Sequence, residues 1–305
     1  MRCRVIVPAS TSNLGPGFDC LGLALEPILR VDLTTVDAPA SRVEVDGPET
    51  RGLPDDETNL TLVAMRETIA RSGSPQPAVR LAIYNEIPIA RGLGSSGAAI
   101  TAGIVLGHLL ARNDEPTRAA ILADAVRVEG HPDNVAPQVL GGFVAAASDG
   151  DRVHTVRLPI PARLEILLVI PEYEVPTREA RRILPDPVPL ADAVFNLSHV
   201  ALLCGALQNE DDDMLRLAMR DRLHERHRVA LVPGLAQALA SLRADPHCVA
   251  AALSGSGPTL LAFYRDVPAA AGSAALAALT EHDVSARLQH VRPRAAGVEW
   301  KRQDA

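Results

Sequence analysis

The sequence predicts an α+β protein built of two halves with a cleft between them. A chain of 305 residues suits two domains of ordinary size. Strand-like segments rich in β-branched residues recur beside segments with helical spacing in both halves. Two prolines, Pro159 and Pro161, favour a boundary near residue 160. We therefore expect one domain over residues 1–160 and another over residues 161–305.

Composition and charge narrow the classes of function. The chain is 47% hydrophobic and has a formal net charge of -7 with acids and bases interspersed, so it lacks the positive field that gathers nucleic acid or anionic lipid. Its N-terminal apolar run is too short for a signal peptide, and LEILLVI is too short to span a membrane. Four cysteines lie far apart without metal-ligand spacing. We expect a cytoplasmic protein with no nucleic-acid or membrane partner.

In the first half, periodicity predicts four strands and an amphipathic helix before a glycine-rich loop. The strands are expected at residues 2–9, 29–37, 41–47 and 77–88, and the helix at residues 59–73. The polar, glycine-rich stretch 10–25 is expected as a turn between packed segments.

Two further helices are expected after the loop. Residues 95–111 are almost wholly apolar and lack proline, which predicts a buried helix with Ser95 or Ser96 at its N-cap. Residues 117–130 show helical spacing and end in glycine, and residues 131–142 are expected to return towards a sheet.

The second half repeats the mixture of strands and helices. Strands are expected at residues 152–159 and 163–171, helices at 194–209 and 232–244, and a strand, tight turn and strand within 248–264.

Three glycine-rich turns follow expected strands, at residues 13–19, 90–97 and 254–259. Each on its own has the composition of an ordinary tight turn. Three of them in one chain would be coherent if all converge on one cleft.

The middle turn has the chemistry of a phosphate site. A helix N-terminus offers unpaired N–H groups and the positive end of the helix dipole, and Gly92, Gly94 and Gly97 let the backbone fold around an anion. A P-loop is excluded, because the only lysine in the chain is Lys301. Phosphate charge must then be offset by amides, hydroxyls, Mg²⁺ or arginine.

The segments PASTSNLGPGFDCLGLAL, IPIARGLGSSGAA and LSGSGPTLLAF, in that order, resemble the three motifs of the GHMP kinases. Within that superfamily, VEGHPDNVAP, PTREARRILP and LHERHR are similar to the homoserine kinases. The resemblance spans residues 5 to 264 or so. It implies an N-terminal ribosomal-protein-like α/β sandwich and a C-terminal ferredoxin-like α+β domain, with the active site in the cleft between them.

The same resemblance implies an activity and its co-substrates. ATP and Mg²⁺ would bind in the cleft, and the γ-phosphoryl group would pass to the side-chain hydroxyl of L-homoserine, giving O-phospho-L-homoserine on the route to threonine. It also suggests a homodimer. The matching positions place ATP at Asn59, Pro88, Ile89, Ala90, Arg91, Gly92, Leu93, Gly94, Ser95, Ser96, Gly97 and Ala98. Ser96 and Glu129 would hold the metal, since Mg²⁺ prefers oxygen ligands.

Homoserine carries a carboxylate, an ammonium and a hydroxyl, so its site needs fixed charges of both signs. Arginine can meet a carboxylate with forked hydrogen bonds, which lysine cannot. The resemblance assigns the substrate to Asn13, Asp19, His131, Asn134, Thr177, Arg181, Arg228 and Gly255.

Asp19, Ser96 and Glu129 are the expected catalytic residues. In related kinases an Asp paired with a Lys is given the role of general base, but no lysine lies near these motifs. We therefore favour Asp19 as a substrate ligand, with the hydroxyl proton passing to the phosphate. His224 is expected to orient Arg228 or to cap a helix.

Two alternatives remain open on the sequence alone. Another GHMP kinase would act on a different alcohol, and a non-catalytic module of the same fold would bind RNA. The segment HERHR departs from the family pattern by having His227 where a Tyr is usual, which leaves the packing beneath Arg228 in question.

Overall fold

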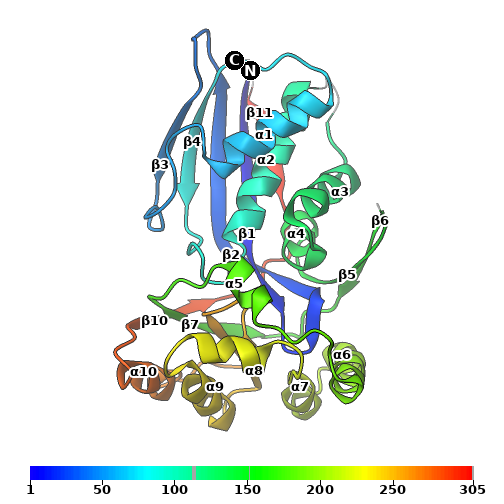
Figure 1. Cartoon of the computed structure of the whole chain (residues 1–305), viewed down its shortest axis with the longest axis vertical. Coiled ribbons are helices and arrows are strands. Elements are labelled where there is room, and N and C mark those ends of the chain that lie inside the picture. The colour runs from blue at the N-terminus through cyan, green and yellow to red at the C-terminus, as the bar shows by residue number, and fades with distance from the viewer. Residues whose placement is uncertain (112–114, 151, 304–305) are drawn as a thin grey trace.

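The computed structural model describes residues 1–111, 115–150 and 152–303 (Figure 1). The first half of the chain holds β1 (Arg2–Asn13), β2 (Gly17–Thr35), β3 (Arg42–Asp46), α1 (Leu60–Arg71), β4 (Val79–Asn85), α2 (Ser95–Ala111), α3 (Arg118–Glu129), α4 (Pro132–Leu140), β5 (Phe143–Asp149) and β6 (Arg152–Leu158). The second half holds β7 (Glu165–Pro171), α5 (Thr177–Arg182), α6 (Leu190–Asn209), α7 (Asp212–Ala218), α8 (Glu225–Arg228), the 3₁₀ turn η1 (Val229–Leu231), α9 (Leu235–Ala244), β8 (Ala250–Leu253), β9 (Leu260–Tyr264), α10 (Ser273–Thr280), β10 (Ala286–Val291) and β11 (Glu299–Gln303).

The first sheet joins strands from both ends of the chain. Its order is β11-β1-β2-β4-β3, with β5 added beside β2 and β6 beside β5. β11 pairs antiparallel with β1, so the two termini lie together at one end of the molecule (Figure 1). The domain boundary near residue 160 stays a prediction, and the pairing shows that residues 299–303 belong to the first sheet.

The expected turn over residues 10–25 is wrong in extent. β1 continues to Asn13 and β2 begins at Gly17, with register shifts after Pro8 and Ser12. Polarity misled the prediction, because the backbone of residues 10–12 pairs with β2 while their side chains are buried at 0–1% exposure. Only three residues connect the strands.

α2 is the buried helix that its apolar sequence predicts, but its N-cap is not Ser95 or Ser96. The helix begins at Ser95, and the Gly94 carbonyl accepts the first helical bond from Ala98 N at 2.9 Å. Gly94 has φ +72°, and a Cβ there would lie 2.1 Å from Ser10 Oγ, so glycine fits where serine does not.

The segment 131–142 holds the helix α4, over Pro132–Leu140, where a return towards a sheet was expected. α4 starts with Pro132 at its first position, where a missing N–H costs nothing. Val135 and Val139, one turn apart, are both fully buried. The following strand β5, which pairs with β2 and β6, was not anticipated.

The second sheet has the order β10-β7-β9-β8, with α9 between β7 and β8 in the chain and α10 between β9 and β10. This is the strand order of a ferredoxin-like unit, as expected. Alternate residues of β7 enter two different cores: Ile166 and Leu168 join the core of the first sheet, and Leu167 and Val169 pack with α9 and α10. Both faces of the sheet are therefore covered.

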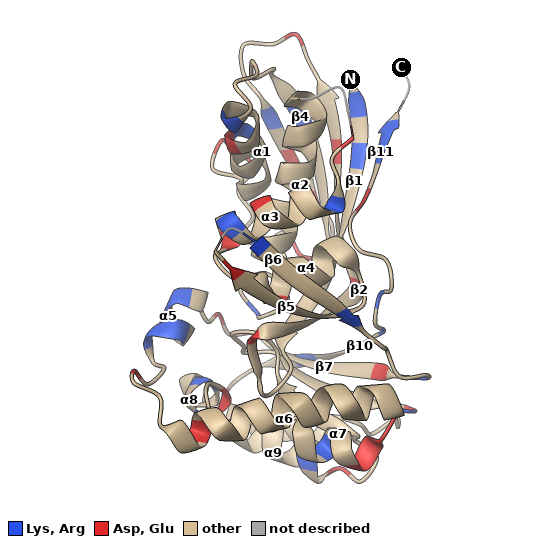
Figure 2. Ribbon diagram, turned by 90° about the vertical axis from the view of Figure 1, so that its right-hand side faces the viewer, with Lys and Arg blue, Asp and Glu red and all other residues tan. Residues whose placement is uncertain are grey.

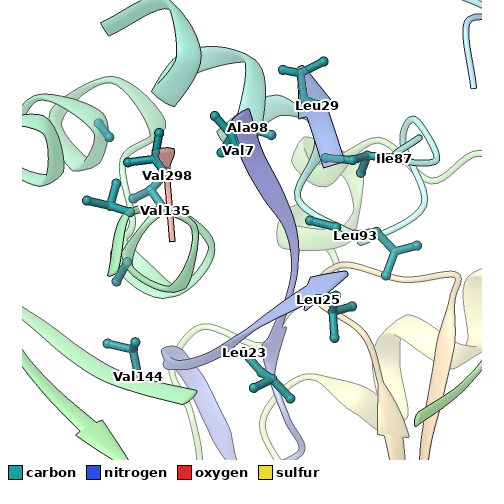
Figure 3. Packing of buried hydrophobic residues seen from close by; sticks show 14 of the residues in the cluster. Val7, Leu23, Leu25, Leu29, Ile87, Leu93, Ala98, Val135, Val144 and Val298 are labelled. Carbon is teal, nitrogen blue, oxygen red and sulfur yellow. The ribbon is translucent and has the colours of Figure 1, made fainter. Parts of the chain in front are cut away.

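The larger core also fixes the ends of the loop between β4 and α2. Ile87, Leu93 and Ala98 are 0–1% exposed, and Figure 3 shows all three among the buried residues, with Ile87 and Leu93 on the β2 side of the cluster. Residues 87–98 are therefore anchored in the core at both ends and near the middle.

Candidate active site

One pocket of about 350 Å³ lies where the two halves meet. It is lined by the loop between β4 and α2, by the turn between β1 and β2, by α5 and by the turn between β8 and β9. We refer to the first as the 88–98 loop and to the second as the 13–19 turn.

The three glycine-rich turns converge on this pocket. Gly255 N donates to Ser12 O at 3.0 Å, and Asn13 Nδ2 donates to Gly255 O at 2.9 Å. Ser254 Oγ lies 2.7 Å from Gly92 O, within hydrogen-bond reach as a donor. Segments more than 150 residues apart in sequence are thus joined by direct hydrogen bonds. The three turns meet at one cleft, as their shared composition suggested.

The 88–98 loop meets its neighbours through backbone. Gly92 has φ +73°, and a Cβ there would lie 2.2 Å from Ser254 O. Gln138 of α4 donates from Nε2 to Gly94 O at 2.7 Å. Arg91 also lines the pocket, but its guanidinium is engaged, because it donates to the carbonyls of Pro171 and Ile89. The loop therefore offers the pocket amides rather than a side-chain cation.

Two oxygen-bearing side chains stand at the N-terminal end of α2. Ser96 Oγ donates to Glu129 Oε1 at 3.1 Å, and both residues line the pocket. Burial raises the pKa of the Glu129 carboxyl, while His131 and the Ser96 hydrogen bond oppose the rise. A hydroxyl and a carboxylate in contact are a donor set that suits Mg²⁺.

At the other end of the pocket, Asp19 pairs with Arg181. Arg181 Nη1 and Nη2 donate to the two carboxylate oxygens of Asp19 at 2.9 and 2.7 Å, and this bond raises the pKa of Arg181. The Asp19 backbone N–H donates to Asn13 Oδ1 at 3.0 Å. Sequence reasoning missed this pairing, because it looked for a lysine near the motifs while the partner lies 162 residues away.

Arg228 is buried at 3% exposure and aimed at the same pocket. Its Nε and Nη1 donate to the carbonyls of Ala180 and Gly255 at 3.1 and 3.0 Å, and its guanidinium lies 5.2 Å from the centre of the Phe18 ring. Burial, helped by the charge of Arg181, lowers the pKa of Arg228 to about 10, which leaves it a cation at neutral pH. The ring of Phe18 packs on this guanidinium, which answers the question raised by the missing Tyr.

α4 supplies a third group of polar residues. His131 Nδ1 lies 2.7 Å from Asp133 Oδ1, and Asp133 is 2% exposed. Burial disfavours the imidazolium, but the bond and charge of Asp133 outweigh it, so the pKa of His131 lies above its ordinary value. Asn134 Oδ1 accepts a hydrogen bond from Ser10 Oγ at 3.0 Å. Asp19, His131 and Asp133 bring ligand atoms within 4.8 Å of one another.

His224 neither orients Arg228 directly nor caps α8 with its side chain. Its Nε2 bonds to Gly15 O at 2.9 Å, and because a carbonyl only accepts, Nε2 carries the proton. Burial lowers the pKa of His224, which favours this neutral form. Its Nδ1 has no hydrogen-bond partner. His224 thus holds the 13–19 turn in place through the Gly15 carbonyl.

Asn196 and Asp221 complete this support. Asn196 Nδ2 donates to Pro16 O at 3.0 Å and to Asp221 Oδ1 at 2.6 Å. The Asp221 side chain is fully buried and accepts the backbone N–H groups of His224 and Glu225. Sequence reasoning missed both residues, and neither carries a local motif that could have pointed to them.

The remaining predicted residues fall into two groups. Thr177 begins α5 and lines the pocket, and Asn59 lines it while capping α1 through Thr61 N at 3.0 Å. Pro88, Gly97 and Ala98 are buried and do not line the pocket. An apolar wall that was not foreseen is made by Leu29, Leu53, Pro54, Leu60, Ile83 and Ala99.

Comparison with known proteins agrees with this geometry. The family model for the GHMP kinases N terminal domain matches residues 59–142, and that for the GHMP kinases C terminal domain matches residues 204–282. A homoserine kinase of Moorella thermoacetica is 40% identical over 289 residues, which cover 95% of this chain and 96% of that protein. A homoserine kinase of Deinococcus radiodurans is 43% identical over 264 residues, 85% of this chain and 83% of that protein.

Solved structures give the same result for the whole architecture. The homoserine kinase of Cytophaga hutchinsonii superposes with a TM-score of 0.83 and 28% identity, covering 98% of this chain and 97% of that one. The mevalonate kinase of L. major, in complex with R-mevalonate, has a TM-score of 0.69 and 14% identity over 95% of this chain and 96% of that one, which speaks to fold alone.

Proposed function

We propose how the pocket works from one premise: the chain belongs to the GHMP kinase family and, within it, to the homoserine kinases. It is accordingly an ATP-dependent kinase that phosphorylates the side-chain hydroxyl of L-homoserine to O-phospho-L-homoserine, a step of threonine biosynthesis. The observation that carries the residue-level proposal is that one pocket joins a glycine-lined helix N-terminus to an Asp19–Arg181–Arg228 group.

ATP phosphates are bound by the 88–98 loop. The N-terminal amides of α2 have no helical partners, and the helix dipole favours negative charge there. The adenine end meets the apolar wall near Leu53 and Pro54, beside Asn59. Because Arg91 donates its hydrogen bonds to backbone carbonyls, the negative charge of the phosphates is offset by the amides, by the hydroxyls of Ser95 and Ser96, and by a cation.

Ser96 and Glu129 are the residues that would hold Mg²⁺. Their oxygens are in contact at 3.1 Å, and a raised pKa at Glu129 fits a carboxyl that waits for a cation in a buried place. The bound ion would offset the charge that develops on the transferred phosphoryl group.

Homoserine is held by groups of both signs at the other end. Nε and Nη1 of Arg228 donate hydrogen bonds to backbone carbonyls, and the remaining guanidinium nitrogen, Nη2, faces the substrate carboxylate. Asp19, which is held in place by Arg181, meets the ammonium. Further polar groups complete the site and orient the hydroxyl for attack: the side chains of His131, Asn134, Thr177 and Asn13 and the backbone of Gly255.

The hydroxyl proton passes to the phosphate, and Asp19 acts as a ligand. Both carboxylate oxygens of Asp19 already accept hydrogen bonds from Arg181, so neither is left free to face the substrate hydroxyl alone. Phosphoryl transfer asks the protein mainly for position and charge, which these residues supply.

We also propose that the enzyme works in the cytoplasm without nucleic acid or membrane, as a homodimer. Four free cysteines and a net charge of -7 support the first part. Among the described residues one helix, α6, is long and apolar enough to cross a membrane. Length and composition are the only grounds for a membrane span, so we take the exposed face of α6 as support for the homodimer.

The test is homoserine-dependent release of ADP, measured with a coupled assay with and without Mg²⁺. Activity with homoserine that needs Mg²⁺ is expected, and mevalonate and sugar alcohols, offered as controls, should give background rates. Stronger turnover of another alcohol would favour the alternative kinase. No ADP above background with homoserine, together with retention of RNA at low salt, would favour the RNA-binding module.

A further inference from the structure

Gln138 is a fully buried polar residue on α4, beside the buried Val135 and Val139, and it does not line the pocket. Its Nε2 donates to Gly94 O at 2.7 Å, and because a carbonyl only accepts, this end of the amide is the nitrogen. The amide oxygen Oε1 has no hydrogen-bond partner among the described residues. A buried amide oxygen without a partner is destabilising, so packing alone would favour an apolar side chain at this position.

The hydrogen bond from Gln138 ends on the residue that begins α2. Gly94 directly precedes Ser95, and its carbonyl also accepts the first helical bond from Ala98 N at 2.9 Å. A carbonyl oxygen has two lone pairs, so one of them continues the helix and the other joins its first turn to α4. The start of α2 is therefore held by a side chain of another helix.

The neighbouring carbonyls of the 88–98 loop are held in the same way. Leu93 O accepts from Ser10 N at 3.1 Å, and Gly92 O lies 2.7 Å from Ser254 Oγ. In a trans peptide the C=O group and the N–H group of the next residue point in opposite directions. The N–H groups of residues 93–95 are thus turned away from these donors, and no described residue accepts a hydrogen bond from them. Successive free N–H groups of this kind form a concave site for an anion.

We propose that Gln138 is a positioning residue for the phosphates of ATP, because its hydrogen bond to Gly94 O aims the Ser95 N–H into the pocket and fixes the start of α2. Ser95 lines the pocket, whereas Gln138 acts on the ligand only through the loop. The inference rests on the proposed function, since it takes the 88–98 loop as the phosphate site. A donor held in advance needs no rearrangement when the anion arrives.

α4 also carries residues of the homoserine end. Asn134 lies one turn before Gln138, and its Oδ1 accepts from Ser10 Oγ at 3.0 Å. In Figures 1 and 2 α4 lies beside the lower end of α2, and Figure 2 draws it almost wholly tan, because Asp133 is its only charged residue. Neutral amides therefore fix the phosphate end and the homoserine end of the pocket relative to each other.

The test is Gln138→Met, which keeps an unbranched side chain of similar length and removes both the donor and the unpartnered oxygen. We expect the KM for ATP and the dissociation constant of ADP, measured by isothermal titration calorimetry, to rise about tenfold. Binding of adenosine, which has no phosphate, and the KM for homoserine should stay at their wild-type values. The melting temperature should not fall, because the unpartnered Oε1 is removed as well.

Gln138→Leu repeats the measurement with another apolar shape and should give the same pattern of ADP and adenosine binding. The matched control is Gln76→Met, since the exposed Gln76 also donates from Nε2 to a backbone carbonyl, that of Arg66 at 3.2 Å. Gln76 does not line the pocket, so this variant should bind ADP like the wild type.

A purely structural tie between α2 and α4 predicts the opposite pattern. A Gln138→Met variant with a lowered melting temperature and unchanged affinity for ADP would overturn the proposal. Equal losses of ADP and adenosine affinity would do the same, because the effect would then not depend on phosphate. A wild-type chain that binds neither ATP nor ADP would overturn the proposed function itself, so the two failures are distinguishable.

Discussion

The 88–98 loop and the 13–19 turn line one pocket and are built by opposite means. In the loop, left-handed backbone falls mainly on glycines, Gly92 and Gly94, and the pocket is offered amides. In the turn, left-handed backbone falls also on Asn13, Leu14 and Asp19, which pay a steric penalty there. The loop therefore needs little help, whereas the turn must be held in place.

The difference shows in where the supports come from. The loop is anchored in the core by apolar residues of its own segment, such as Ile87 and Leu93, and its carbonyls accept hydrogen bonds from Gln138 and Ser254. The turn is held by Arg181, Asn196 and His224, all from the second half of the chain. An amide site is specified locally, and a site made of charged side chains is specified by distant partners that keep each charge paired.

The largest effect is expected at the metal end of the loop. Glu129→Gln should lower kcat about a thousandfold, because several kcal/mol of charge stabilisation depend on the cation that this carboxylate would hold. Steady-state kinetics with varied Mg²⁺ measure it, and Glu67→Gln on the exposed face of α1 is the matched control. Unchanged kcat and Mg²⁺ dependence would remove Glu129 from the metal site.

The backbone character of the loop is tested by Gly92→Ala. The new Cβ meets both a left-handed backbone and the Ser254 carbonyl, so we expect a loss of about 3 kcal/mol in the free energy of unfolding, together with a raised KM for ATP. Gly73 shares the left-handed φ at +70° but has nothing within 4 Å of its added Cβ. Gly73→Ala should therefore cost only about 1 kcal/mol in urea denaturation. Equal losses for the two variants would contradict the close approach.

The charged character of the turn is tested by Asp19→Asn. Loss of the carboxylate charge should raise the KM for homoserine roughly 30-fold, and the partial exposure of Asp19 limits the effect to that size. The KM for ATP should stay unchanged, because Asp19 lies at the homoserine end of the pocket. Asp32→Asn breaks a surface pair with Arg4 and serves as control. A variant that keeps its homoserine KM but loses several orders of magnitude in kcat would make Asp19 the general base.

The sequence predicts the loop better than the turn for the same physical reason. Its glycines, its serines and the apolar helix behind it stand in one run of residues, so the site can be read from periodicity and turn chemistry. Local rules also predict most strands and helices. They fail for α4, whose residues were expected to return towards a sheet; local rules disfavour a helix with Pro137 inside it, and tertiary packing holds it.

The turn exposes what local reading leaves out. The Asp19–Arg181 pair and the Asn196–Asp221 bond join residues that only the fold brings together. A lone Arg, Asn or Asp in the second half has no pattern around it that marks such a role. The resemblance to a family supplies Asp19 and Arg181 as separate residues, and only the structure makes them a pair.

The smallest effect expected at neutral pH is a titration at the metal end of the loop, where a carboxyl lies beside the backbone amides. Amides do not titrate, whereas burial raises the pKa of Glu129 above its ordinary value of 4.5. As the pH falls through that raised pKa, Mg²⁺ affinity should drop, by up to about tenfold per pH unit below it, because the carboxyl must lose its proton to bind the ion. In the metal-free protein the sign is reversed: the folded state binds the proton more tightly than the unfolded state, so the free energy of unfolding falls as the pH rises from 4.5 through the raised pKa. Thermal unfolding over this range with and without Mg²⁺ measures both, and Glu129→Gln should flatten both curves; if the variant keeps the wild-type pH dependence, another group holds the ion.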